Sequence, residues 1–456
     1  MYIEEIKITN LRVFAEASAT FQYPERAMKA GERVLTHPNV NLILGNNGAG
    51  KSSLLKAVAL AVLGPLAERY PTMMIVRRRR GAKKLPPFKT PAGLLPGETC
   101  QVTADFMLTW QDLQAKPADH RRYPLPFHLT IEPRGSEEIP NLRENNWDPS
   151  AAGSGGSIWR PIFDNASPAF FAVGYGATRR VDTDPTAATP LQKMKHMPLR
   201  HQRIQSLFTE GYTLIQLGHW LPTLKTKNPG RYKQVCNLIN EVLPEKIEFT
   251  QRTDRNGEYL FCQHGALVPF AALSDGCRAF IGWVADMLYH LCFGCPKGVK
   301  LVDNCGIVLV DEIDLHLHPE WQREILPKLA KTFPNLQFIV TSHSPIVVGT
   351  LQRENLWVCE PARDGDGSVL VQKDTGVNGL NADQILNTEY FGLESSRAPE
   401  KSRRLKRIAN AVERKTPGQA SAFLKSLVTA MEDEDEPVME QVIAPVKKAA
   451  ARRKKK

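Results

Sequence analysis

The sequence lacks the features that mark secreted and membrane-spanning proteins. Its 456 residues contain no uninterrupted run of about 18 apolar residues, the length that a membrane-spanning helix needs. The opening residues, 1–10, are acidic and β-branched instead of basic and then apolar, so we expect no signal peptide. The eight cysteines follow no framework spacing, which is typical of thiols kept reduced. We therefore expect a cytoplasmic protein without a membrane contact.

The sequence also shows no internal repeat and no sustained heptad pattern, so we expect no long coiled coil. Buried strands are indicated at 40–44, 307–310 and 336–340, and helical stripes follow at 54–62 and 321–332. Strands that alternate with helices predict an α/β fold with a mixed or parallel sheet as its core. Weaker signals between 65 and 270 are assigned to an α-rich lateral insertion. Further strands are predicted at 3–8, 18–22, 356–359 and 369–371, the last two as a hairpin.

The positive charge of the chain is concentrated in two runs. The net charge is +11, and the runs from Arg77 to Lys84 and from Lys447 to Lys456 carry six and seven positive charges, so the rest of the chain is slightly acidic. The second run follows an acidic block, 432–436, which is typical of a disordered, charge-segregated tail. The first run lies in a predicted loop, and both loosely held nucleic acid and plain solvation are compatible with it.

The strongest motif is GNNGAGKS at 45–52, between a predicted strand and a predicted helix. It satisfies the G-x-x-x-x-G-K-[ST] pattern, whose glycines let backbone N–H groups surround phosphates. Lys51 is expected to reach the β- and γ-phosphates, and the Ser52 hydroxyl to bind Mg²⁺. The predicted nucleotide-binding residues of this motif are Asn46, Asn47, Gly48, Ala49, Gly50, Lys51, Ser52 and Ser53. ATP and Mg²⁺ are the predicted ligands.

Two further strands end in residues with matching chemistry. The apolar segment 307–310 ends in Asp311 and Glu312, and carboxylates at the carboxyl edge of a buried strand commonly build a ligand site. Asp311 is expected to hold the hydration shell of Mg²⁺, and Glu312 to activate the attacking water as general base. His343 follows the strand at 336–340 and is expected to hydrogen-bond the γ-phosphate.

A fourth motif, LSDG at 273–276, opens the next helical stripe. The order of phosphate loop, long insertion, LSxG helix, acidic strand and histidine resembles the ABC-type ATPases, including the structural-maintenance and DNA-repair branch. In that family the LSxG helix binds the γ-phosphate held by another protomer. The resemblance therefore implies that Ser274 and Gly276 act in trans, in a head-to-tail dimer or a higher homo-oligomer.

The motifs also look similar to the ATPases of bacterial anti-phage systems, such as the Septu and PARIS ATPases and the overcoming-lysogenization-defect group. The similar segments are 8–14, 174–179, LSDG with Arg278, and 311–322. The resemblance places Asn10 and Arg12 near the base or ribose and Arg179 near the phosphates. It implies a sensor or regulatory subunit that responds to a phage protein and controls a separate effector, expected to be a nuclease. The alternative is a DNA-repair or recombination ATPase that clamps duplex DNA.

These signals divide the chain into five expected parts. They are an N-terminal ATPase lobe at 1–64, the lateral insertion at 65–270, a C-terminal ATPase lobe at 271–375, a helical segment at 376–430 and the disordered tail at 431–456.

Overall fold

The computed structural model describes residues 1–26, 34–69, 100–115, 123–134, 137–141, 159–181, 198–363, 365 and 367–393. The basic run at 77–84, the predicted helical segment beyond 393 and the predicted tail lie outside these residues.

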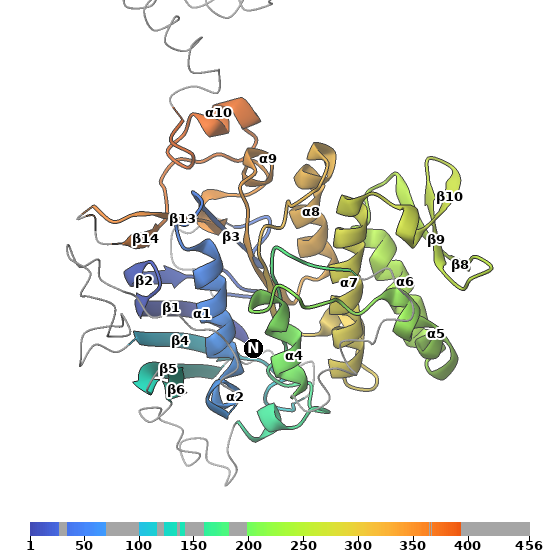
Figure 1. Cartoon of the computed structure of the whole chain (residues 1–456), viewed down its shortest axis with the longest axis horizontal. Helices are drawn as coiled ribbons and strands as arrows, with labels where there is room; N and C mark the ends of the chain where they lie inside the picture. Colours follow the sequence, from blue (N-terminus) through green and yellow to red (C-terminus); the bar gives the residue numbers. More distant parts are fainter. Residues whose placement is uncertain are drawn as a thin grey trace, which may run out of the picture. The chain divides into compact units, whose positions relative to one another are not determined.

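The main sheet has eleven strands in the order β6-β5-β4-β1-β2-β14-β13-β3-β12-β11-β7 (Figure 1). The strands β6, β5, β4, β1 and β2 pair antiparallel, whereas β13, β3, β12, β11 and β7 pair parallel. The bounds are β1 Tyr2–Leu11, β2 Phe14–Thr20, β3 Val40–Gly45, β4 Cys100–Leu108, β5 Tyr123–Arg134, β6 Glu137–Asn141, β7 Ala172–Tyr175, β11 Gly306–Val310, β12 Leu336–Thr341, β13 Leu356–Pro361 and β14 Ser368–Val371. The sheet is therefore mixed, as the predicted α/β fold requires.

Helices and a small second sheet complete the described fold. The helices are α1 Lys51–Leu63, α2 Pro65–Arg69, α4 Leu199–Ile204, α5 Leu217–Lys227, α6 Pro229–Val242, α7 Asp275–Gly294, α8 Pro319–Thr332, α9 Pro345–Val348 and α10 Ala382–Leu386. The second sheet, in the order β10-β9-β8, consists of β8 Ile247–Thr253, β9 Tyr259–Gln263 and β10 Ala266–Pro269. The longest helix of the described residues, α7, has 20 residues, so this part of the chain holds no long coiled coil. None of the described helices is long and apolar enough to cross a membrane.

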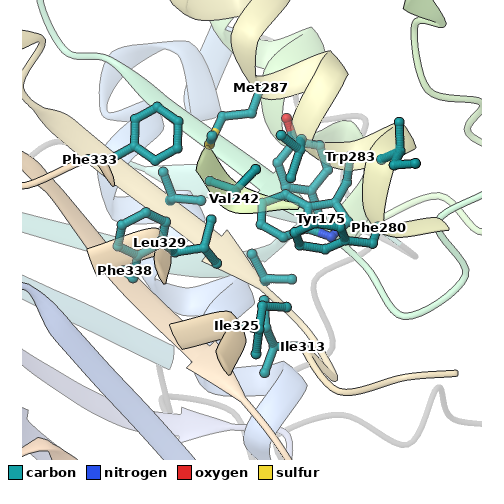
Figure 2. Close-up of a cluster of buried hydrophobic side chains, with 14 of the residues drawn as sticks. Tyr175, Val242, Phe280, Trp283, Met287, Ile313, Ile325, Leu329, Phe333 and Phe338 are labelled. Carbon is teal, nitrogen blue, oxygen red and sulfur yellow. The ribbon is translucent and has the colours of Figure 1, made fainter. Parts of the chain in front are cut away.

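The central strands bury side chains on both faces and so separate two hydrophobic cores. On β11, Val308 and Val310 join the core formed with α7 and α8, while Ile307 and Leu309 join the core formed with α1. This division follows from the two-residue period of a strand, which sends successive side chains to opposite faces. Figure 2 shows the first core, where Trp283 gathers with residues of α8 and the sheet.

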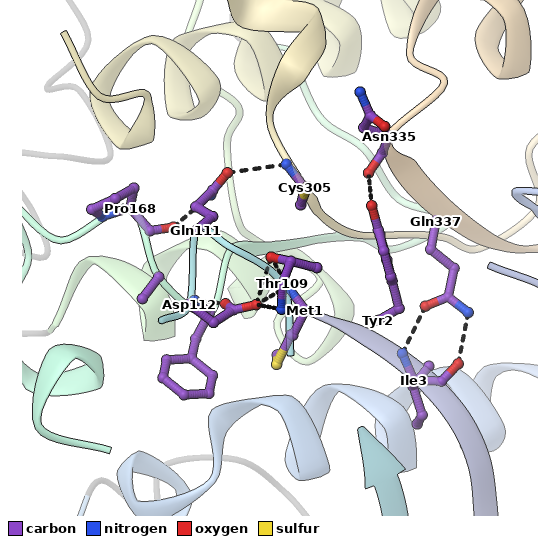
Figure 3. Close-up of polar contacts among 12 residues, drawn as sticks. Met1, Tyr2, Ile3, Thr109, Gln111, Asp112, Pro168, Cys305, Asn335 and Gln337 are labelled. Atoms are coloured by element: carbon purple, nitrogen blue, oxygen red, sulfur yellow. Dashed lines mark hydrogen bonds and ion pairs between the residues drawn. The ribbon is translucent and has the colours of Figure 1, made fainter. Parts of the chain in front are cut away.

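A buried polar seam ties the first strand to the parallel part of the sheet (Figure 3). The Gln337 side chain accepts from the Ile3 backbone N–H at 2.8 Å and donates to the Ile3 carbonyl at 2.7 Å. The Tyr2 hydroxyl donates to the Asn335 carbonyl at 2.9 Å, and the Met1 amine lies 2.5 Å from the buried Asp112 carboxylate. The contacts of Tyr2 and Ile3 join segments more than 300 residues apart in the sequence, with separations of 333 and 334 positions.

The strand predicted at 18–22 is misplaced: β2 begins at Phe14 and ends at Thr20. Its buried face after Phe14 consists of Ala17 and Ala19, whose small side chains give a weak alternation signal. Strands β4 to β7 all lie between 65 and 270 and join the main sheet, whereas we expected an α-rich insertion there. The hairpin predicted at 356–371 is confirmed, because β13 and β14 pair antiparallel.

Candidate nucleotide site

The predicted phosphate loop runs from the end of β3 to the start of α1. Gly45 has a φ of 143°, and a Cβ there would lie 2.5 Å from the Cys359 carbonyl oxygen. Gly50 caps α1 with a φ of 114°, and a Cβ there would lie 2.6 Å from the Phe14 ring. Both positions therefore require glycine for conformation and for space. The loop delivers the N-terminus of a 13-residue helix, where unpaired N–H groups and the helix dipole favour an anion.

Lys51 is the first residue of α1, and its side chain folds back onto the loop. Its Nζ donates to the carbonyls of Gly45 at 2.9 Å and Asn46 at 3.2 Å, and the residue is 6% exposed. Burial lowers the pKa of Lys51, while nearby negative charges, those of Asp311 and Glu312 among them, oppose the shift. A phosphate in the loop would give this buried cation the counter-charge that two carbonyls cannot supply. Ser52 is half-buried and Ser53 is buried in the same first turn.

The remaining predicted residues come together because neighbouring parallel strands end at one edge of the sheet. The strands β3, β12, β11 and β7 lie side by side in this order. Asp311 and Glu312 follow β11, the half-buried His343 follows β12, and Arg179 follows β7. The sheet thus brings both acids, the histidine and the phosphate loop to the same edge, as the motifs predict.

Thr341, the last residue of β12, connects the two acids. Its Oγ1 donates to Asp311 Oδ1 at 2.6 Å and accepts from the Glu312 backbone N–H at 2.7 Å. Arg179 Nη2 donates to the Glu312 carbonyl at 2.6 Å. The contacts of Thr341 and Arg179 with Glu312 were not predicted from the sequence. They join residues 29 and 133 positions apart, and no local pattern encodes such pairings.

A cavity of about 650 Å³ opens beside the phosphate loop. It is lined by Arg12 and Val13, by the loop itself, by the β13–β14 hairpin and by residues 389–392. Of the predicted residues, the cavity contains Arg12, Asn46, Asn47, Gly48 and Ala49. Its size is that of typical small-ligand sites. The segment 389–392, with Tyr390 and Phe391, was not predicted to take part, because no motif marks it.

Ser274 and Gly276 lie at the start of α7 and contribute nothing to this cavity. Ser274 is exposed, and its Oγ accepts from the Cys277 backbone N–H at 3.4 Å as the helix cap. Gly276 is buried against the loop that follows Glu312, since a Cβ there would lie 2.1 Å from the His316 carbonyl oxygen. The predicted signature residues therefore stand apart from the described lining of the phosphate-loop cavity.

Oxygen donors at this edge fit Mg²⁺ bound together with phosphates. Asp311 is 7% exposed, and its Oδ1 accepts a hydrogen bond from Thr341. Its Oδ2 has no partner among the hydrogen bonds of the described residues. The described residues hold no group of three or more His, Cys, Asp or Glu side chains that would cage a metal. Mg²⁺ typically uses one or two protein oxygens and takes its other ligands from water and phosphate. The pair of Ser52 and Asp311 has this character.

Two domain families match this chain. Residues 5–82 match a family described as "AAA domain", and residues 222–349 match one described as "AAA domain, putative AbiEii toxin, Type IV TA system". The first match contains the phosphate loop, and the second contains both acids and His343. Two separate segments of the chain therefore resemble AAA domains.

Curated relatives of this chain include a Septu protein and two retron proteins. It is 24% identical to the Septu protein PtuA of Bacillus mycoides (strain KBAB4) over 355 residues, 77% of this chain and 40% of the relative. It is 50% identical to "Retron Ec83 probable ATPase" of Escherichia coli over 86 residues, 19% of this chain and 16% of the relative. It is 43% identical to "Retron Vc95 probable ATPase" of Vibrio cholerae serotype O1 biovar El Tor over 124 residues, 27% of this chain and 23% of the relative.

These matches confirm the resemblance to the Septu ATPases, and each of them covers less than half of the relative's length. The resemblance to the overcoming-lysogenization-defect group stays a prediction. Among solved structures, the SMC head domain from Thermotoga maritima is similar over 82% of this chain and 100% of that chain, with 15% identity and a TM-score of 0.42.

Proposed function

We propose that this chain binds ATP with Mg²⁺ and hydrolyses it at the edge formed by β3, β12, β11 and β7. The observation that carries this proposal is the position of a buried Lys51 in the phosphate loop after β3 and of Asp311 and Glu312 after β11, at the same edge of the sheet with only β12 between the two strands. A phosphate-binding cation, a metal-binding acid and a second acid beside it are the groups that phosphoryl transfer to water needs.

Each residue then has a defined task. The N–H groups of the loop and Lys51 bind the β- and γ-phosphates, and Ser52 and Asp311 hold Mg²⁺, which neutralises phosphate charge when bound. Glu312 orients the attacking water and accepts its proton. His343 donates a hydrogen bond to the γ-phosphate. Arg12, in the wall of the 650 Å³ cavity, contacts the base or ribose.

The proposed site is composite and is completed by a second copy of the chain. Ser274 is exposed at the N-terminus of a 20-residue helix and does not line the cavity of its own chain. A helix N-terminus attracts anions, and here it is free to meet a γ-phosphate from outside. Ser274 and Gly276 therefore act on the nucleotide of the partner in a head-to-tail dimer or a higher homo-oligomer.

The similarity to Septu and retron proteins supports a role in bacterial anti-phage defence. In this proposal the ATPase is the sensor and regulatory subunit of a complex. A phage protein is the trigger, and nucleotide-dependent assembly restrains or releases a separate effector, expected to be a nuclease.

A second candidate function is a DNA-repair or recombination ATPase that clamps duplex DNA, and the six charges between Arg77 and Lys84 favour it. Binding through phosphates releases counterions, so the affinity would fall steeply between about 50 and 200 mM salt. Duplex affinity of the purified chain with this salt dependence, lost when the six charges are replaced by Ser, would favour the clamp. Salt-independent or undetectable binding would leave the defence subunit as the better explanation.

ATP turnover of three variants tests the proposed site. We expect Lys51→Ala to abolish nucleotide binding, and Glu312→Gln to lower kcat by about 100-fold or more while ATP still binds, because general-base assistance typically contributes 10²–10⁴-fold. The control is Glu241→Gln, an equivalent change at an exposed position of α6. Turnover by the Lys51→Ala and Glu312→Gln variants at the wild-type rate would show that another site performs the reaction.

A further inference from the structure

Glu312, the proposed general base, has a backbone conformation that glutamate rarely adopts. Its φ is 50°, in the left-handed region, which is unfavourable for a residue with a Cβ. Such a conformation persists only where neighbouring groups enforce it. The backbone conformation also sets the direction of the Glu312 side chain, because the orientation of the Cα–Cβ bond depends on the backbone dihedral angles.

Contacts from the two strands that flank β11 fix both ends of this residue. From β12, Thr341 accepts the Glu312 N–H at 2.7 Å. From the segment after β7, Arg179 Nη2 donates to the Glu312 carbonyl at 2.6 Å, and this carbonyl also accepts from the Leu315 N–H at 3.0 Å. The peptide is therefore held across three neighbouring strands, and Arg179 supplies the only charged group among these donors.

Arg179 is itself an unusual residue to find inside a protein. It is 8% exposed, and its Nε and Nη1 are buried without a hydrogen-bond partner in the described part of the chain. Burial lowers the pKa of Arg179 to about 10, and the charges of Asp311, Asp314 and Glu312 oppose this shift, so the guanidinium remains charged at neutral pH. A buried cation with one hydrogen bond to a neutral carbonyl is costly as a purely structural device.

We propose that Arg179 is a positioning residue for the reaction, which holds the Glu312 peptide in its left-handed conformation and so aims the carboxylate at the attacking water. The inference rests on the proposed ATPase function. Arg179 then affects the rate of the chemical step, through Glu312, and does not affect the affinity for the nucleotide. The neighbouring Arg180, whose side chain is exposed, supplies a matched control.

Steady-state kinetics of the full chain test this assignment. We expect Arg179→Met to lower kcat by about 10- to 100-fold, since displacement of a catalytic group by about 1 Å has this effect, while KM for ATP changes less than about threefold. Arg179→Lys keeps the charge and the stem but not the planar fork, and is expected to recover part of the loss. Arg180→Met is expected to behave as the wild type.

A double-mutant cycle separates positioning from structural damage. If Arg179 acts through Glu312, adding Arg179→Met to Glu312→Gln lowers the residual turnover by less than about threefold, because coupled residues are not additive. Equal fold losses in both backgrounds would overturn the proposal, as would a KM effect larger than the kcat effect. If Arg179→Met fails to fold, Arg179→Lys is carried through the same cycle.

The failure of this inference is distinguishable from failure of the proposed function. A wild type that turns over ATP, loses activity in Glu312→Gln and is unaffected by Arg179→Met overturns the positioning role alone. A wild type without Glu312-dependent turnover overturns the proposed function, and the positioning role with it.

Discussion

At the scale of single residues, one hydroxyl has two tasks at the candidate site. Thr341 Oγ1 donates to the Asp311 carboxylate and accepts from the Glu312 N–H, at 2.6 and 2.7 Å. Thr341 itself is fully buried. The orientation of the proposed metal ligand and that of the proposed base therefore depend on the same side chain.

We expect Thr341→Val, which keeps the branched shape, to reduce the free energy of unfolding by about 1–3 kcal/mol, the usual cost of a buried polar group left unpaired. It should also lower kcat more than tenfold, because misplaced catalytic groups cost this much or more. Urea unfolding and ATP turnover measure the two effects. Thr341→Ser retains the hydroxyl and is the control; a Val variant as active as the Ser variant would show that the shared hydroxyl does not matter for the reaction.

The same residues show where prediction from the sequence succeeds and where it stops. The phosphate loop and the pair Asp311–Glu312 are recognisable because their chemistry is contained in short, contiguous motifs. The contacts of Thr341 and Arg179 with Glu312 were not predicted, although the family resemblance had already drawn attention to Arg179. They depend on the order of strands in the sheet, which places β7 and β12 on either side of β11.

At the scale of elements, a buried carboxylate joins α7 to the sheet. Asp286 of α7 accepts from the Tyr175 hydroxyl and from the Ile215 N–H, both at 2.9 Å. His290 Nε2 lies 3.5 Å from the same carboxylate, but burial lowers the pKa of His290 well below its ordinary value, so it gives no positive charge at neutral pH. Arg203 is also buried nearby. Burial raises the pKa of Asp286 to about 6.

This pKa predicts a pH-dependent contribution to stability. The unfolded carboxyl has a pKa of about 3.9, so between about pH 4 and 6 the folded state binds more protons and stability falls as pH rises. Below and above this window the contribution is constant. Asp286→Asn removes it, so the free energy of unfolding of the variant relative to the wild type should rise by about 2 kcal/mol from pH 4 to pH 7. Urea unfolding at intervals across this range measures the difference, and parallel pH profiles of the two proteins would contradict the assignment.

The strands of the main sheet differ in how readily they can be predicted from the sequence. The buried strands β3, β11 and β12 were predicted within one residue at each end, because short runs dominated by apolar residues are typical of buried strands. Strand β4, by contrast, alternates buried and half-buried positions along CQVTADFML, and its polar residues conceal it in a simple reading of hydrophobicity. Its period of two was nevertheless present, and a search for that period would have found the strand.

At the scale of the whole molecule, the composite site that we propose would combine surfaces from two copies of the chain. The phosphate loop, both acids and His343 share one edge of the eleven-stranded sheet, whereas Ser274 is exposed at the start of α7. Closed assemblies of identical chains pair such distinct surfaces by symmetry. A head-to-tail dimer would place the loop of each copy against α7 of the other and would create two equivalent sites.

Mixing two inactive variants tests this arrangement directly. Lys51→Ala removes the phosphate-binding cation but leaves Ser274 intact, and Ser274→Arg does the reverse. In a head-to-tail dimer of the two variants, one site carries both lesions and the other carries neither. Because half of the dimers in an equal mixture are heterodimers with one intact site of two, we expect turnover to recover to about a quarter of the wild-type rate. Each variant alone should stay inactive.

Recovery of turnover in that mixture and its absence lead to opposite conclusions about Ser274. Recovery shows that Ser274 acts on the nucleotide of another copy, since no single chain in the mixture holds both residues. Mixing Lys51→Ala with Glu312→Gln is the matched control: both lesions lie on the same edge of the sheet, so neither orientation of the heterodimer contains an intact site, and turnover should stay low. If Ser274→Arg binds ATP, forms mixed dimers by mass measurement and still shows no recovery, the composite site is wrong.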